Sequence, residues 1–224
     1  MRRVERPSPN HDDRGGAVVD TLVLHYTGMP TARAALERLC DPLAKVSSHY
    51  TIGEDGIIYA HVPEAQRAWH AGVAHWAGAA NINSRSIGIE LVNPGHEYGY
   101  RAFAEVQLQA LTTLCHSILM RHAIPSWRVL GHSDVAPARK EDPGELFPWK
   151  RLADAGIGLW PERKPSNLEA QSLARFGYDP DAPLEKVITA FQRHFRPRLI
   201  DGQWDTECAE LLHGLLDKFT RPAL

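Results

Sequence analysis

The fold of this chain is constrained most by one feature of its sequence: short apolar runs alternate with amphipathic helical segments. Residues 17–27 read AVVDTLVLHYT, a short run of β-branched and aliphatic residues that is typical of a buried strand. Residues 86–93 and 127–134 contain further strands, and apolar residues recur at helical spacing from Phe103 to His122. Strands alternating with helices predict an α/β domain around a mixed sheet.

Two more elements and a long loop complete this pattern. Residues 31–39 favour a helix with Thr31 as its N-cap. Residues 47–62, SSHYTIGEDGIIYAHV, favour a β-hairpin because alternating apolar residues flank Asp55-Gly56. Residues 67–83 form a loop rich in Trp, His, Gly and Ala, and long ordered loops usually carry function.

The composition changes near residue 155, where Gly and Pro concentrate in AGIGLWPERKPS. We therefore predict an N-terminal extension over residues 1–16, a first domain over 17–155, a linker over 156–166 and a small three-helix domain over 167–224. The three helices are expected within residues 167–176, 184–195 and 205–219. Because a bundle of ~58 residues is marginal alone, we expect it to pack against the first domain.

Charge and cysteine content narrow the classes of partner and compartment. Lys and Arg number 25 against 27 Asp and Glu, so nothing favours nucleic acid as a partner. Three distant cysteines, Cys40, Cys115 and Cys208, cannot form a paired disulfide framework. The chain lacks an apolar secretory segment near Met1 and any run of ~18 apolar residues. We expect a cytoplasmic monomer, or a periplasmic protein if a leader has been removed.

Two histidines stand at predicted strand ends, which is where ligands collect in open α/β sheets. His25 closes the first apolar strand, and His132 closes the last. Asp142 follows in a loop that Pro137 and Pro143 keep from being helical. Two imidazoles and one carboxylate suit a catalytic Zn²⁺ that keeps its fourth position for water. On spacing alone, hydrogen-bonded structural histidines are the alternative.

Two further residues fit a hydrolytic metal site. Lys140 lies two residues before Asp142, and residues two apart in an extended segment point to the same side. It is expected to stabilise a developing oxyanion, with a solvated surface lysine as the alternative. Glu90 lies in an apolar strand, where an unpaired carboxylate is costly to bury. It is expected to face the strand-end histidines as a general base, with a salt bridge to an arginine such as Arg85 as the alternative.

The strings VLHYTG, SSHYTIGEDGIIY, RAWHAG, NSRSIGIELVN and GHSDVAPARKEDPG occur in this order along residues 18–152. This region resembles the type-2 N-acetylmuramoyl-L-alanine amidases, a family of zinc amidases. The resemblance implies a mixed central sheet flanked by helices, as in peptidoglycan recognition proteins, with zinc in a groove. It matches His25, His132 and Asp142 to the zinc ligands, Glu90 to the general base and Lys140 to the oxyanion stabiliser.

The C-terminal stretch is similar to the three-helix peptidoglycan-binding domain, with its marks at 176–178, 190–192 and Asp201-Gly202. Relatives with this domain pairing are typically exported and lipid-anchored, whereas this chain shows neither a signal nor a lipobox cysteine. In phage and animal relatives a catalytic tyrosine precedes a His-Tyr or His-Phe pair, and here that position is Ser48. Glu90 must then carry the base role.

Four residues are predicted to bind substrate. His70, in RAWHAG, is expected to line the groove, as the corresponding residue of the family does. Trp76 is expected either to stack on a sugar face or to anchor its loop as a buried residue. Arg85 and Asn93 flank the strand of Glu90 and are expected to meet the carboxylates and amides of a stem peptide. Of the remaining histidines, His49 is expected in the core, His61 at a strand end or in a loop, His75 on the groove rim, and His96, His116, His122, His194 and His213 on the surface.

Together these residues predict a zinc hydrolase of peptidoglycan or muropeptides that serves cell-wall turnover and recycling. It would cut the amide between the lactyl group of N-acetylmuramic acid and L-alanine. A non-catalytic peptidoglycan-binding or sensing module and a zinc peptidase acting on the stem peptide are the alternatives. A pure binder has no need of the complete set of presumed ligands, base and lysine, so the enzyme is favoured.

Overall fold

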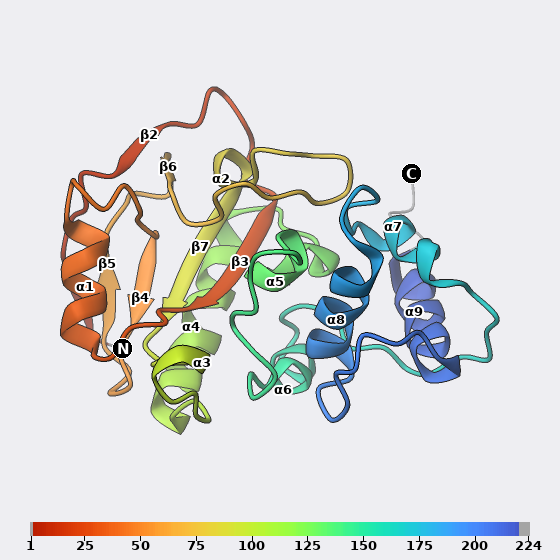
Figure 1. The fold of residues 1–224 in the computed structure, drawn as a ribbon. Coiled ribbons are helices and arrows are strands. Elements are labelled where there is room, and N and C mark those ends of the chain that lie inside the picture. Colours follow the sequence, from red (N-terminus) through yellow and green to blue (C-terminus); the bar gives the residue numbers. More distant parts are fainter. Residues whose placement is uncertain (1, 220–224) are drawn as a thin grey trace.

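The computed structural model describes residues 2–219; residue 1 and residues 220–224, which fall within the predicted extension and C-terminal domain, lie outside the described residues. Within this range a six-stranded mixed sheet forms the centre of the molecule, in the order β1-β5-β4-β7-β3-β8 (Figure 1). Its strands are β1 Arg3–Glu5, β3 Thr21–Tyr26, β4 Tyr50–Ile52, β5 Ile58–Ala60, β7 Ser86–Leu91 and β8 Val129–Gly131. β4 and β5 pair antiparallel as the predicted hairpin, and the other neighbours pair parallel. The predicted mixed α/β fold is confirmed.

Helices flank this sheet and form the C-terminal part of the chain. They are α1 Ala32–Cys40, α2 Ile82–Arg85, α3 Gly95–Tyr98, α4 Glu105–Arg121, α5 His132–Val135, α6 Trp149–Asp154, α7 Leu173–Phe176, α8 Leu184–Phe195 and α9 Thr206–Phe219, with 3-10 turns at Ser126–Arg128 and Ala170–Ser172. α1 begins where predicted, because the Thr31 side chain accepts a hydrogen bond from the backbone N–H of Ala34. The third expected C-terminal helix, α9, starts one residue later than predicted.

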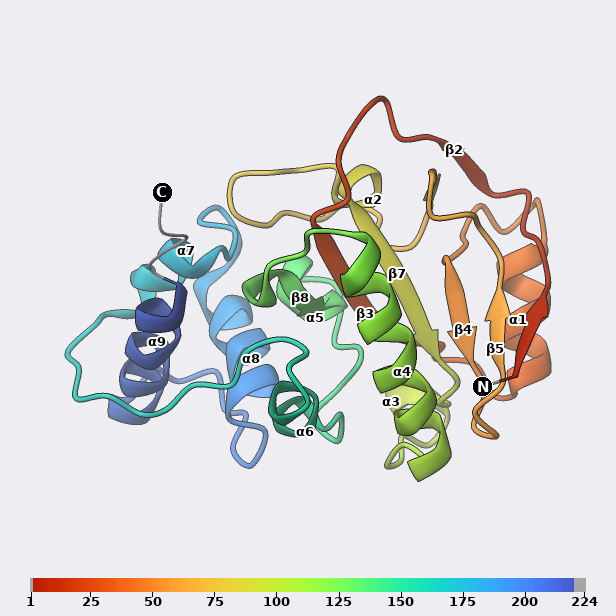
Figure 2. The same ribbon diagram turned by 180° about the vertical axis from the view of Figure 1, so that it is seen from behind.

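The strands β3 and β7 present alternate residues to two different faces of the sheet. One set of apolar side chains is fully buried in a core beneath α4, which covers this face in Figure 2; it includes Leu22, Leu24, Ile87 and Ile89. The intervening residues, His25 and Glu90 among them, face the other side. The alternation of the sequence therefore places the polar residues of both strands on the face opposite α4.

The described part of residues 1–16 belongs to the fold. β1 pairs with β5, and β2, His11–Asp13, pairs antiparallel with β6, Gln66–Ala68. The buried Arg14 guanidinium donates to the carbonyl oxygens of Ser84 and Ser86. The sheet thus begins ahead of the boundary predicted at residue 17. These two strands carry no apolar periodicity because they are short and largely exposed.

The C-terminal helices share a core with the sheet face that α4 leaves open, on the right of Figure 1. That core combines Val23, Trp76, Leu130 and Val135 with Phe176, Tyr178, Phe191 and Leu212. The expected packing of the small helical unit against the first domain is therefore observed. The contact matters for the site, because α5 lies between the sheet and α8 and begins with His132.

Candidate active site

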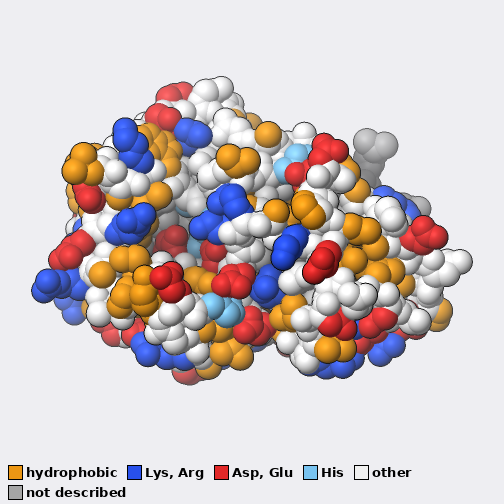
Figure 3. Space-filling model, viewed as in Figure 1, with side chains coloured by type: hydrophobic (Ala, Val, Ile, Leu, Met, Phe, Trp, Pro, Cys, Tyr) orange, Lys and Arg blue, Asp and Glu red, His pale blue; other side chains and the backbone are white. Residues whose placement is uncertain are grey.

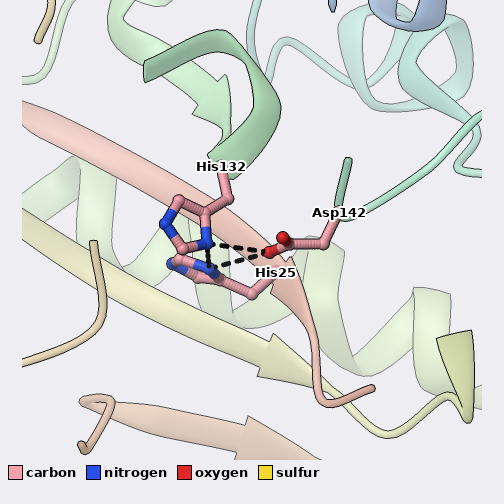
Figure 4. Close-up of side chains that lie close together, drawn as sticks. All are labelled: His25, His132 and Asp142. Atoms are coloured by element: carbon pink, nitrogen blue, oxygen red, sulfur yellow. Dashed lines mark hydrogen bonds and ion pairs between the residues drawn. The ribbon is translucent and has the colours of Figure 1, made fainter. Parts of the chain in front are cut away.

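His25, His132 and Asp142 converge at the carboxyl ends of two neighbouring parallel strands. β3 and β8 pair with Leu24 opposite Gly131, and the residue that follows each of them is a histidine. The two Nδ1 atoms lie 3.0 Å apart, and Asp142 Oδ2 lies 3.0 Å from His25 Nδ1 and 3.1 Å from His132 Nδ1 (Figure 4). All three side chains are buried. The structure brings the predicted ligand set together.

The hydrogen bonds around His132 show which atoms of this cluster carry protons. His132 Nε2 lies 3.0 Å from the carbonyl oxygen of Ala71, which can only accept. A neutral His132 therefore carries its proton on Nε2 and turns the lone pair of Nδ1 toward Asp142. Burial lowers the pKa of His25 to about 4, which keeps that ring neutral at pH 7.

These contacts fit a metal ion. Two imidazole nitrogens and a carboxylate oxygen point at one another at hydrogen-bond distance, and a cation between them satisfies all three. Among residues 2–219, His25, His132 and Asp142 form the group of ligand-type side chains whose donor atoms all lie within 4.8 Å of one another. We therefore assign these residues as a candidate metal site.

Glu90 lies beside this cluster. It stands opposite His25 in the register of β7 and β3, and both residues line the same cavity. Its Oε2 atom is buried without a hydrogen-bond partner. Burial raises the pKa of Glu90 well above its usual range, the charge of Asp142 raises it further, and Lys140 lowers it. The alternative salt bridge between Glu90 and Arg85 is absent from the described residues.

The cavity opens on the face shown in Figure 3, where acidic side chains lie in a hollow flanked by basic ones. Its volume is about 450 Å³. Lys140 is exposed on its wall, a position that fits both the expected oxyanion stabiliser and the alternative of a solvated surface lysine. Further lining residues include Tyr26, Arg38, Trp69, His96, Arg139 and Glu141. His96, predicted as a surface residue, thus lies on the cavity rim.

Two of the four predicted substrate-binding residues lie elsewhere. Arg85 forms an ion pair with Asp20, at the amino end of β7 and away from the cavity. Asn93 is 2% exposed; its amide donates to the Arg101 carbonyl and accepts from the Gly95 backbone N–H. The structure gives neither side chain access to the cavity. Arg85 precedes β7 and Asn93 follows it, and their nearness to Glu90 in sequence did not place either side chain in the cavity.

The expectation that Trp76 stacks on a sugar face is wrong as well. It is 0% exposed and packs edge-to-face against Phe176 and Tyr178, with ring centroids 5.6 and 5.0 Å away. No ring face is left for a sugar, because the loop of Trp76 folds onto the C-terminal helices instead of rimming the groove. The alternative expectation, a buried loop anchor, describes it. His70 does line the cavity, but its Nδ1 lies 3.0 Å from His25 Nε2.

The burial predicted for the other histidines is correct in some cases and wrong in others. His49 is fully buried, and its Nδ1 accepts a hydrogen bond from the Gly88 backbone N–H, as expected of a core histidine. His194 was predicted on the surface, but it is buried, stacks on Trp149 and lies 2.8 Å from Asp134 Oδ2. That prediction is wrong because Asp134, distant in sequence, supplies a polar partner inside the protein.

Two residues whose hydrogen bonds support the site were not predicted from the sequence. Arg139 donates to the carbonyl oxygens of Ala71 and Val73 and so fixes the loop that also holds His132. Asp134 accepts from the Gly131 backbone N–H and from the Tyr178 hydroxyl, each at 2.7 Å. Both residues lie in the HSDVAPARKEDPG stretch, but the local sequence does not predict which distant residues they contact.

The fold and this ligand set define a metal-site hydrolase of the amidase type, and comparison with known proteins agrees. Residues 15–145 match the family model described as N-acetylmuramoyl-L-alanine amidase, and the chain belongs to this family. The amidase AmiD of Escherichia coli K12 is 39% identical over 90% of this chain and 83% of its own length. The 1,6-anhydro-N-acetylmuramyl-L-alanine amidase AmpD of the same strain is 34% identical over 67% of this chain and 89% of its own length.

Solved structures support the same assignment. A complex of E. coli AmiD with anhydro-N-acetylmuramic acid-L-Ala-D-γ-Glu-L-Lys has a TM-score of 0.81 and 38% identity, and covers 93% of each chain. AmpDh3 of Pseudomonas aeruginosa has a TM-score of 0.83 and 33% identity, and covers 96% of each chain. The family and fold predicted from the five motifs are confirmed.

Proposed function

We propose that this protein is a zinc-dependent N-acetylmuramoyl-L-alanine amidase that hydrolyses the amide between the lactyl group of N-acetylmuramic acid and L-alanine. One observation carries the proposal: two imidazole nitrogens and a carboxylate oxygen converge in a cavity that also contains the partnerless Glu90 carboxyl group. The ligands named for AmiD and for AmpDh3, an anhydro-muramoyl tripeptide and an anhydromuramic pentapeptide, support muropeptides as the substrate class.

The chemistry divides among the cavity residues. His25, His132 and Asp142 would hold Zn²⁺, which when bound supplies a Lewis acid that polarises the scissile carbonyl and acidifies water. Glu90 takes a proton from the attacking water and returns it to the leaving amine. A raised pKa suits both transfers, because a carboxyl group that titrates nearer neutrality retains the proton between them. Lys140, on the cavity wall, offsets the negative charge that develops on the carbonyl oxygen.

The position of the cleaved bond tests this function. Purified zinc-loaded protein is incubated with an anhydro-muramoyl tripeptide, and the products are identified by mass spectrometry. We expect anhydro-N-acetylmuramic acid and the intact tripeptide. Shortened stem peptides would indicate a peptidase, and unchanged substrate that remains bound would indicate a binding module.

We also propose a division of labour along the chain. Residues 17–155 would form the catalytic domain, since all the residues assigned to catalysis lie within them. Residues 167–224, joined through the linker 156–166, would form a peptidoglycan-binding domain. Its described helices, α7, α8 and α9, support the three-helix assignment.

The compartment and the oligomeric state are proposals of the same kind. None of the helices within residues 2–219 is both long and apolar enough to cross a membrane. Cys40, Cys115 and Cys208 are free thiols, which supports a reducing compartment, and we propose a cytoplasmic monomer. Cell fractionation and light scattering test these two points, and recovery from the periplasm or as a dimer would contradict them.

A further inference from the structure

A chain of buried hydrogen bonds runs from His25 away from the metal site. His25 Nε2 lies 3.0 Å from His70 Nδ1, and His70 Nε2 lies 3.0 Å from the Ser86 hydroxyl. The Ser86 hydroxyl lies 2.6 Å from the carbonyl oxygen of Ile82. His25 and His70 line the cavity but are only 1% and 8% exposed, and Ser86 is fully buried, so these groups have little access to bulk water. Each group in the chain must find its partner within it.

The far end of the chain fixes every proton along it. The Ile82 carbonyl can only accept, so the single hydroxyl proton of Ser86 is directed toward it. The Ser86 oxygen then accepts from His70 Nε2–H. A neutral His70 with its proton on Nε2 has a bare Nδ1, which accepts from His25 Nε2–H. His25 in turn is left with its lone pair on Nδ1, the atom that faces His132 and Asp142.

We propose that His70 and Ser86 are positioning residues that set the tautomer of His25 and so prepare its Nδ1 for the metal. This inference rests on the proposed zinc site. The competing tautomer is the reason such a device is needed: with its proton on Nδ1, His25 would donate to Asp142 Oδ2 3.0 Å away. That bond would occupy two of the three metal-binding atoms at once. The chain of hydrogen bonds disfavours this state before any metal arrives.

Packing holds the His70 ring in the orientation that this role requires. The ring lies against Gly88 of β7, where an added Cβ would be 2.5 Å from His70 Cγ. It meets the rings of His25 and His49 edge-on, with centroids 5.1 and 5.7 Å away. His70 therefore cannot rotate freely to exchange its two nitrogens. The groove residue predicted from RAWHAG thus acts mainly through a metal ligand.

Zinc affinity in the absence of substrate tests the proposal. We would measure Kd by competition with a chelator for the parent and for His70→Ala, His70→Asn and Ser86→Ala. We expect His70→Ala to weaken zinc binding by ~10–100-fold, the usual effect of removing such a partner. His70→Asn should recover part of this loss, since its amide oxygen can accept from His25 Nε2–H. Ser86→Ala should also weaken binding, because His70 loses the acceptor that fixes its proton.

Ser84→Ala provides the matched control. Ser84 lies two residues before Ser86 in sequence, and its hydroxyl also donates to a backbone carbonyl, that of Asn81. Its removal should leave the zinc Kd unchanged. Values for His70→Ala and Ser86→Ala within twofold of the parent would overturn the proposal.

A second measurement reads the tautomer directly and does not depend on any variant folding. In metal-free protein labelled with ¹⁵N-histidine, NMR should find the proton of His25 on Nε2. A His25 proton on Nδ1 would overturn the proposal. Neither measurement uses substrate, so failure of the positioning proposal can be told apart from failure of the proposed amidase function. A parent protein that passes both tests but leaves muropeptides intact would contradict only the amidase function.

Discussion

His25 and Glu90 stand directly opposite each other in the parallel register of β3 and β7. Their side chains therefore project from the same face of the sheet, beside one another. A slip of one residue in this pairing would turn either side chain toward the core beneath α4. The relation between the proposed metal ligand and the proposed base is thus built into the sheet and does not depend on a mobile loop.

Replacement of Glu90 separates catalysis from binding. Glu90→Ala should lower turnover of a muropeptide by ~100-fold or more, the usual scale for a positioned general base. Zinc content and substrate affinity should stay near the parent values, because Glu90 is not among the ligand set. Glu37→Ala, on the exposed face of α1, is the matched control. Near-normal turnover of Glu90→Ala would mean that the carboxylate is structural.

The pH dependence of turnover follows from the environment of Glu90. Burial, and then the charge of Asp142, raise the pKa of this carboxyl group above its usual value of 4.5. A base works only when deprotonated, so activity should rise with pH through this raised pKa. Bound Zn²⁺ more than neutralises the charge of Asp142 and so opposes this rise, whereas burial still favours the protonated carboxyl group. We expect burial to outweigh the metal charge, so a kcat profile at saturating zinc should show its acid limb above pH 4.5; a limb below that value would contradict this expectation.

The contact between Asp134 and Tyr178 predicts a stability effect. The buried Asp134 carboxylate accepts from the Tyr178 hydroxyl of the C-terminal part at 2.7 Å. Tyr178→Phe removes this donor and should lower the free energy of unfolding by ~1–3 kcal/mol. Denaturant titration measures the loss, with the exposed Tyr98→Phe as control. Equal stability of the two variants would show that the bond contributes nothing.

Truncation near Pro165 tests the division of labour between the two parts. It uncovers Trp76 and removes two partners of Asp134, Tyr178 and His194, so the melting temperature should fall. Hydrolysis of a small soluble muropeptide should persist in the folded fragment, while action on intact sacculus should fall. The AmpD of Escherichia coli K12 matches only 67% of this chain over 89% of its own length, which supports a shorter active unit. A folded fragment that leaves the small substrate intact would mean that the C-terminal part completes the active site.

The positions of the candidate ligands could be predicted because they depend on short-range rules. A buried strand alternates with period two, and parallel strands end at the same edge, so His25, His132 and Glu90 could be placed without knowing the rest of the fold. Asp142 and Lys140 followed from their spacing after His132, and the family motifs then matched all five residues to roles. The same rules found β4, β5, α4 and α8, whose patterns are local.

The failures concern partners that are distant in sequence. Trp76 and His194 are buried by the docking of the C-terminal helices, which no local pattern describes. Arg85 lies near Glu90 in sequence, yet it stands at the amino end of β7 whereas Glu90 stands near the carboxyl end. There Arg85 forms an ion pair with Asp20. The hydrogen bonds of His70 became evident only once Ser86 and Gly88 of β7 were seen against its ring.

The metal dependence of hydrolysis tests the central claim most directly. Elemental analysis of the purified protein should find about one zinc per chain, because three protein ligands form one open site. Treatment with a chelator should abolish hydrolysis of a defined muropeptide, and added Zn²⁺ should restore it. Metal-free protein that cleaves the muropeptide at the full rate would contradict the account.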